Sequence, residues 1–220
     1  YRDCGSGTTK SGTLLYCCAP DLLRYCNPSN AVVTGLFSYC GHDVQSSAYG
    51  HDFSKNDYGL HGRIPPYLLY PLKSSTGLSL DSMFINCRNI SYYTQGGRSY
   101  VIPKTFFNYC PNITSMVYTF SGFSFPQTID LNVFSYITAS KLGNINHIFY
   151  MPNFTGTSTS PCDVSNVFST FRGLTNTAYA FAATYNENNL SVKIVNQYVK
   201  FSNVFPTGVY NNATSYGSNQ

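Results

Sequence analysis

The sequence predicts a repeat solenoid in which short strands alternate with short helical or 3-10 turns. The first reason is the pattern apolar-Phe-x-x-Cys, which recurs along the chain and is typical of stacked units that share one core. The second is composition, because Thr, Tyr, Phe, Val and Ile suit pleated structure whereas the strong helix formers Ala and Glu are scarce. The third is turn content, with 17 Gly and 11 Pro. An all-β sandwich is the alternative.

The 220 residues divide into one large repeat domain and two atypical ends. Residues 1–21 carry no clear unit and are predicted to be an N-terminal cap or a connection to another part of a longer protein. Residues 22–209 form the irregular repeat domain, which includes a long polar insertion at 41–63. The Asn-, Ser- and Gly-rich segment 210–220 is predicted to be an outgoing linker.

Each unit joins an apolar residue and a Phe to a Cys, or a large apolar residue, three positions after the Phe. Full copies span 36–40, 83–87 and 106–110, and variants span 22–26, 133–137 and 167–171. With an Ile or Leu six positions after the Phe, these residues share one face of a short helix or 3-10 turn. The residues predicted to form the repeat core are Phe37, Cys40, Phe84, Cys87, Ile90, Phe107, Cys110, Ile113, Phe134, Phe168, Phe171 and Leu174.

A second segment follows in three of the units, where Ile113, Leu142 and Leu174 each precede a Phe by seven positions. The β-rich run 114–120 predicts a strand there. Residues 91–102, with Gly96-Gly97 at their centre, are predicted to form a hairpin.

The fullest unit, residues 102–116, reads IPKTFFNYCPNITSM. It resembles the BspA-type leucine-rich repeat, whose units run Ile-Pro-x-x-apolar-Phe-x-x-Cys-x-x-Leu-x-x-Ile. The resemblance covers about residues 64–182, with weaker echoes at 22–44 and 199–206. It implies a leucine-rich-repeat-like scaffold that recognises another surface, as in surface proteins of gut and oral bacteria and in their phages. It assigns no ligand-binding residues, because such repeats share a scaffold and not a site.

The eight cysteines fall into two groups. Cys26, Cys40, Cys87 and Cys110 occupy the repeat position, where a small thiol fits a core, so we expect them to be buried rather than paired. Cys4, Cys17, Cys18 and Cys162 are the candidate disulfide cysteines. Cys17 and Cys18 are not expected to pair with each other, because a disulfide requires a particular Cα separation and torsion.

Several classes of function find little support in the sequence. The net charge of +4 comes from scattered bases, which predicts no nucleic-acid partner, and no apolar run is long enough to span a membrane. His42-Asp43, His51-Asp52 and Cys40-Gly41-His42 could supply a base or metal ligands, but they border or lie in the polar insertion, where a histidine is usually solvated. Without a G-x-S-x-G or H-E-x-x-H motif, we expect no catalytic residues, no metal and no cofactor.

Asn-x-Ser/Thr sequons occur five times, close to what chance gives in so Asn-rich a chain. Asn89 and Asn112 share one repeat position, which suggests a structural role. The candidate glycosylation sites are therefore Asn153, Asn189 and Asn212.

The predicted function is a non-enzymatic binding module of a larger surface assembly, such as a bacterial adhesin or a phage virion or tail protein. Its location would be extracellular, on a cell surface or in a virion, and its partner a surface protein, a glycan or other subunits of the assembly. The binding residues are unknown, although loop tyrosines suit such surfaces: Tyr49, Tyr58, Tyr92, Tyr93 and Tyr216. The alternatives are a purely structural virion or fibre component and a viral spike-like attachment domain, since residues 204–208 are faintly similar to a turn of coronavirus spike N-terminal domains.

Overall fold

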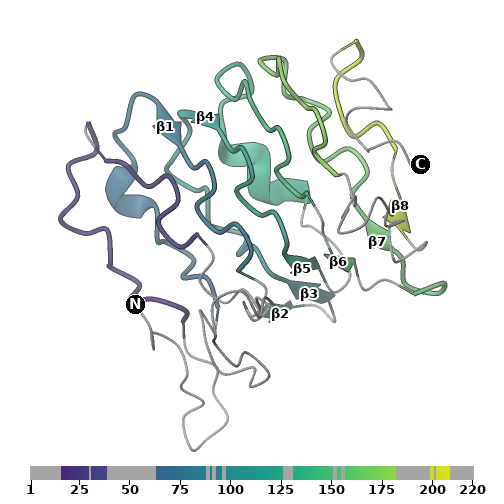
Figure 1. Ribbon diagram of the computed structural model, residues 1–220, viewed down its shortest axis with the longest axis horizontal. Coiled ribbons are helices and arrows are strands. Elements are labelled where there is room, and N and C mark those ends of the chain that lie inside the picture. Colours follow the sequence, from purple (N-terminus) through teal and green to yellow (C-terminus); the bar gives the residue numbers. More distant parts are fainter. Residues whose placement is uncertain are drawn as a thin grey trace, which may run out of the picture.

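The computed structural model describes residues 16–29, 31–38, 63–87, 90, 93–95, 98–125, 131–150, 153–154, 157–181, 199–200 and 202–208. In these ranges the chain winds into successive coils that lie side by side, in sequence order, from the N-terminal to the C-terminal end of the molecule (Figure 1). Five coils fall largely within the described residues and span, in order, 16–38, 63–87, 101–125, 131–150 and 157–181. The residues around 202–206 begin another coil.

Regular secondary structure is confined to short elements. The 3-10 helices are η2 (Tyr70–Leu72) and η3 (Leu131–Tyr136). The strands are β1 (Leu78–Ser79), β2 (Tyr93–Gln95), β3 (Arg98–Tyr100), β4 (Ile113–Ser115), β5 (Ser124–Phe125), β6 (Asn153–Phe154), β7 (Cys162–Asp163) and β8 (Val199–Lys200). The strand expected at 114–120 is therefore limited to its first residues, and turns follow it.

Strands of neighbouring coils pair in parallel. β1 pairs with β4, β5 with β6 and β7 with β8, and isolated parallel bridges continue from Ser115 to Asn144 and from Asn144 to Asn176. The exception in the described ranges is the antiparallel pair β2–β3, in which Gln95 lies opposite Arg98 across Gly96-Gly97. This pair confirms the predicted hairpin.

The strands are short because backbone N–H groups alternate between two kinds of partner. In the third coil, the N–H groups of Tyr118 and Phe120 donate to Asn146 and Ile148 of the next coil. The N–H group of Thr119, which lies between them, donates instead to the Met116 carbonyl within its own coil. Each coil is therefore a run of tight turns that also pairs with its neighbour, which satisfies the buried backbone without long strands.

One column of aromatic rings runs through the stack, and we call it column A. Its rings stack from coil to coil with centroids 5.2, 6.1, 6.0 and 5.1 Å apart. All five are buried. The column consists of Phe37, Phe84, Phe120, Phe149 and Phe181.

A second column, column B, faces the first across the core. It begins with the buried Leu69 and continues through rings whose successive centroids lie 5.2, 5.0 and 6.2 Å apart. Its aromatic members are Phe107, Phe134, Phe168 and Phe205. Edge contacts of about the same length join the two columns, such as Phe107 with Phe120 at 6.5 Å and Phe134 with Phe149 at 6.4 Å.

The two columns correct the expected equivalence of the repeat units. The sequence pattern places Phe84 with Phe107, but Phe84 belongs to column A and Phe107 to column B. Likewise Ile113 pairs with Leu78 in the β1–β4 ladder and not with Ile90. The coils from 63–87 to 157–181 thus each contribute two core positions, one to each column, and the apolar-Phe-x-x-Cys pattern occurs in both columns.

All the described repeat-core residues are buried. Phe37, Phe84, Phe107, Phe134 and Phe168 are at most 1% exposed. The others are also buried: Cys87, Ile90, Cys110, Ile113, Phe171 and Leu174. Cys40 lies outside the described residues.

A left-handed backbone position recurs two residues before each Phe of column A. The backbone angle φ at this position lies between +54° and +67°, a range that residues other than Gly adopt infrequently. The position directs the side chain outward while the Phe that follows enters the core. Its occupants are Gly35, Ser82, Tyr118, His147 and Tyr179.

Candidate binding surface

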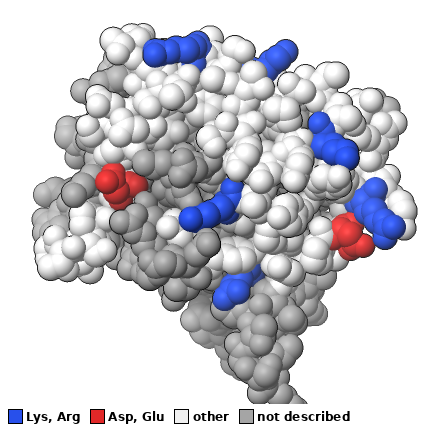
Figure 2. All heavy atoms as spheres, turned by 180° about the vertical axis from the view of Figure 1, so that it is seen from behind, with Lys and Arg blue, Asp and Glu red and all other residues white. Residues whose placement is uncertain are grey.

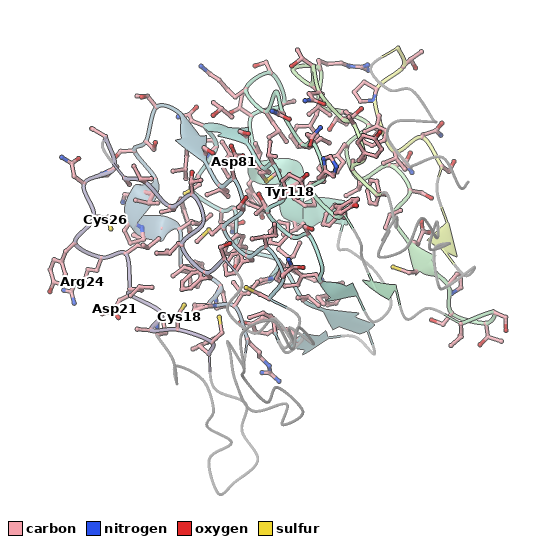
Figure 3. The ribbon with its side chains drawn as sticks, in the orientation of Figure 1. Cys18, Asp21, Arg24, Cys26, Asp81 and Tyr118 are labelled. Atoms are coloured by element: carbon pink, nitrogen blue, oxygen red, sulfur yellow. The ribbon has the colours of Figure 1, made fainter. Side chains whose placement is uncertain are left out.

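The outward position before column A carries a continuous aromatic stack. The Tyr118 and His147 rings stack with centroids 4.4 Å apart, and the His147 and Tyr179 rings with centroids 4.9 Å apart. Tyr150 meets His147 edge-on at 4.8 Å. Tyr118 lies near the middle of the stack of coils (Figure 3). The stack thus joins three coils, with His147 packed between two tyrosine rings and Tyr179 at its end 40% exposed.

His147 is a neutral member of this stack. Its burial lowers the pKa of the imidazole to about 4, and Nδ1 is paired with the Oδ1 atom of Asn146. A histidine that stays neutral at physiological pH and packs between two tyrosines suits a structural role better than proton transfer. His42 and His51, which the sequence offered as candidate bases or metal ligands, lie outside the described residues.

A second group of aromatic side chains is open to solvent, and we call it the tyrosine face. It consists of Tyr67, Tyr70, Tyr109 and Tyr136, which are 54%, 42%, 54% and 50% exposed. They come from the column B side of three consecutive coils, since Cys110 reaches back to Leu69 and Phe134 stacks on Phe107. Exposed aromatic side chains repeated in this way are typical of recognition surfaces.

The contacts of Tyr70 with Tyr109 and Lys73 fix the centre of the tyrosine face. The Tyr70 and Tyr109 rings meet edge to face, with centroids 5.1 Å apart. The Lys73 ammonium lies 4.4 Å from the Tyr70 ring centroid and donates a hydrogen bond to the Tyr70 hydroxyl at 2.9 Å. Tyr70 and Lys73 are held by η2, which begins at Tyr70 with Pro71 inside its first turn. The cation and the rings are thereby positioned by a short rigid element.

Basic residues outnumber acidic ones in the described part of the coils that carry the tyrosine face. Between residues 63 and 150, the described ranges contain five basic residues and the single acid Asp81. The Asp81 carboxylate is already engaged, since its Oδ1 atom accepts hydrogen bonds from Ser115 at 2.6 Å and from the Val117 N–H at 2.8 Å. Seen from behind, Lys and Arg are spread singly over the surface, and acidic side chains lie only toward its two sides (Figure 2).

The loop tyrosines singled out from the sequence do not supply this surface. Tyr93 is an anchor: its hydroxyl donates to the backbone carbonyl of Ile64, and the Arg63 guanidinium lies 5.1 Å from its ring centroid. Burial raises the pKa of the Tyr93 phenol. The remaining four, Tyr49, Tyr58, Tyr92 and Tyr216, lie outside the described residues.

Sequence reasoning missed the tyrosine face, although one signal could have found it. In the pattern apolar-Phe-x-x-Cys, the second x position lies between inward-facing residues and is expected to point outward. Tyr25, Tyr109 and Tyr136 occupy the second x position, and all three are exposed.

The thiols of the repeat position are buried except at the first coil. Cys87 and Cys110 are buried, and their thiols donate to backbone carbonyls of the preceding coil. The expectation that Cys26 is buried is wrong, because its side chain is exposed at the N-terminal end of the stack (Figure 3). In the described residues no coil precedes that of Cys26, so no neighbouring backbone covers its thiol.

The candidate disulfide cysteines that can be placed are free thiols in the structure. Cys17, Cys18 and Cys162 are buried and unbridged, and Cys4 lies outside the described residues. A hydrogen bond with Cys18 and burial raise the pKa of Cys17, and burial raises the pKa of Cys162 to about 12. Within the described ranges no group of three His, Cys, Asp or Glu side chains could hold a metal ion.

The sequon at Asn112 has a structural role, as expected. Its Nδ2 atom, the atom to which a glycan would be attached, donates a hydrogen bond to the Ser75 carbonyl at 3.0 Å. This nitrogen is therefore engaged in a contact between coils. Asn153 begins β6, whereas Asn89, Asn189 and Asn212 lie outside the described residues.

No helix in the described ranges is long and apolar enough to cross a membrane. The comparisons with known proteins add no relationship: no protein-family model, no curated protein and no solved structure matches the chain.

Proposed function

We propose that the chain is a non-enzymatic recognition module, a leucine-rich-repeat-like solenoid that binds its partner through the tyrosine face. It would serve in a larger surface assembly, such as a bacterial adhesin or a phage virion or tail protein, outside the cell. The single observation that carries this proposal is the exposure of tyrosines on three consecutive coils, at 42–54% each.

Exposed tyrosine side chains are well suited to binding a partner. A tyrosine ring removed from water on binding contributes a large apolar area and loses little rotamer freedom, and its hydroxyl can still hydrogen-bond at the rim. Tyr109 and Tyr136 follow Phe residues that stack at 5.2 Å, so the buried column fixes the spacing of the exposed side chains. Such a rigid surface loses little entropy when a partner binds.

The stacked coils support the solenoid part of the proposal. Backbone hydrogen bonds join each described coil to the next, and two columns of rings continue through the stack. Neither feature depends on a long strand, which favours a repeat scaffold over the alternative sandwich.

Binding of fluorescently labelled protein to intact bacterial and animal cells tests the proposal. We expect saturable binding to at least one cell type, and a loss of at least tenfold in affinity for the double variant Tyr109→Ser with Tyr136→Ser. The matched control is Tyr179→Ser, the same change at a 40% exposed tyrosine on the column A side of the fifth coil, which should bind as the parent does. Equal losses in both proteins would contradict a specific surface, and binding only to subunits of its own assembly would favour the purely structural alternative.

A further inference from the structure

We propose that Tyr70, Lys73 and Tyr109 form a subsite for a carboxylate-bearing sugar, such as a uronic or sialic acid residue at the end of a glycan. The inference rests on the proposed function and names the class of ligand that the tyrosine face recognises.

The aromatic part of the subsite is Tyr109. Its ring meets the Tyr70 ring at 86°, so that the edge of one ring points at the face of the other. In either assignment the Tyr70 ring covers at most one face of Tyr109, and the Tyr109 side chain is 54% exposed. The C–H groups of a pyranose carry a small positive charge and pack well on such a face, which is negative.

The charged part of the subsite is Lys73. Its side chain is exposed, and one of its three N–H donors is used by the Tyr70 hydroxyl at 2.9 Å. Two donors remain for a carboxylate, and the contact with the Tyr70 ring holds the ammonium in place. The Tyr70 hydroxyl can donate its own hydrogen to a second carboxylate oxygen or to a sugar hydroxyl.

The distribution of charge favours a single carboxylate over a polysulfated chain. A heavily sulfated glycan needs a contiguous row of cations, whereas the described contacts of Tyr70 and Tyr109 include one cation, Lys73. The carboxylate of Asp81, the one acid in the described ranges between residues 63 and 150, is engaged by Ser115 and the Val117 N–H. One ammonium beside an open ring matches one carboxylate on a sugar ring.

Titration of the full chain with saccharides, followed by NMR of the tyrosine ring protons, tests this inference. The probes are sialyllactose, a glucuronic-acid disaccharide, lactose and a heparin-derived tetrasaccharide. We expect at least one of the two carboxylated probes to shift the Tyr109 signals and to bind at least tenfold more tightly than lactose. The variant Lys73→Gln should lose about tenfold in affinity for that probe and leave the weak binding of lactose unchanged.

The matched control is Lys141→Gln, which removes the same charge from another exposed lysine and should bind as the parent does. Thermal unfolding of each variant confirms that the fold persists. Equal binding of lactose, tighter binding of the heparin fragment, or equal losses in the two lysine variants would overturn the inference. If neither carboxylated probe binds while cells still bind through Tyr109 and Tyr136, the sugar assignment fails and the recognition function stands; if cell binding is also insensitive to those tyrosines, both fail.

Discussion

The Cys87 thiol donates a hydrogen bond to the carbonyl oxygen of Phe37, with 2.9 Å between Sγ and O. Cys110 has the same relationship with Leu69 at 3.0 Å. In both cases the cysteine three positions after a column residue reaches back to the column residue of the preceding coil. The recurring cysteine is therefore a hydrogen-bond donor between coils as well as a small core residue.

Replacing one of these thiols should destabilise the stack. In Cys87→Ala the Phe37 carbonyl loses a buried donor and a small cavity remains, so we expect a loss of about 1–3 kcal/mol in the free energy of unfolding. Denaturation in urea measures the loss. The control Cys26→Ala, at an exposed thiol, should change stability by less than about 0.5 kcal/mol. Similar losses for the two variants would argue against the inter-coil role.

Alkylation should separate the cysteines by burial. Iodoacetamide reacts with thiolates, and burial raises the pKa of Cys110 and of Cys162 to about 12. We expect rapid modification of Cys26 in the folded protein, and modification of Cys110 and Cys162 only after denaturation. Peptide mapping by mass spectrometry measures each site, and rapid native labelling of Cys110 would contradict its burial.

A double-mutant cycle tests the assignment of the two columns. Phe84 and Phe120 stack within column A at 6.1 Å, so the changes Phe84→Leu and Phe120→Leu should couple by about 0.5–1.5 kcal/mol. Phe107→Leu, in column B, should couple with Phe84→Leu more weakly, because these two rings are linked through Phe106 and Phe120. Stronger coupling of Phe84 with Phe107 than with Phe120 would contradict the assignment of Phe84 and Phe107 to different columns.

The stack around His147 should make stability depend on pH. The imidazole has a pKa of about 4 in the folded protein and an ordinary value of 6.5 when unfolded, so the unfolded state binds more protons between these values. Stability due to this group is fully present above pH 6.5 and falls as the pH is lowered toward 4. We expect His147→Phe, which keeps a ring between Tyr118 and Tyr179, to unfold at a temperature that depends less on pH over this interval. Identical profiles for the parent and the variant would contradict the buried neutral imidazole.

Alanine substitutions at two glycines with left-handed backbone distinguish the cost of backbone strain from the cost of a steric clash. A Cβ at Gly122 (φ +75°) would lie 2.4 Å from Oδ1 of Asn86 in the adjacent coil, whereas a Cβ at Gly208 (φ +82°) would meet no atom within 4 Å. Gly208→Ala should cost about 1–2 kcal/mol from backbone strain alone. Gly122→Ala should cost clearly more, as measured by chemical denaturation. Equal costs would show that Asn86 moves aside without penalty.

Part of this architecture could be predicted from the sequence. The inward positions follow from chemistry, because Phe and Cys at fixed spacing must be buried together, and Phe134 and Phe168 are buried accordingly. The two columns could not be separated, since both use the same apolar-Phe-x-x-Cys pattern and only three-dimensional pairing shows that Phe84 stacks on Phe120. The tyrosine face was also missed, because Tyr109 lies inside a unit interpreted as core and its direction depends on the turn around it.

The parallel pairing of neighbouring coils has a mechanical consequence. Each described coil of the stack is bonded mainly to the coil before it and the coil after it, so a pull applied to the two ends would load the outermost contact first. The chain should then extend by release of one coil at a time, and the long segments between coils would lengthen with each release. The coils that carry Tyr109 and Tyr136, nearer the middle of the stack, would be released after an end coil.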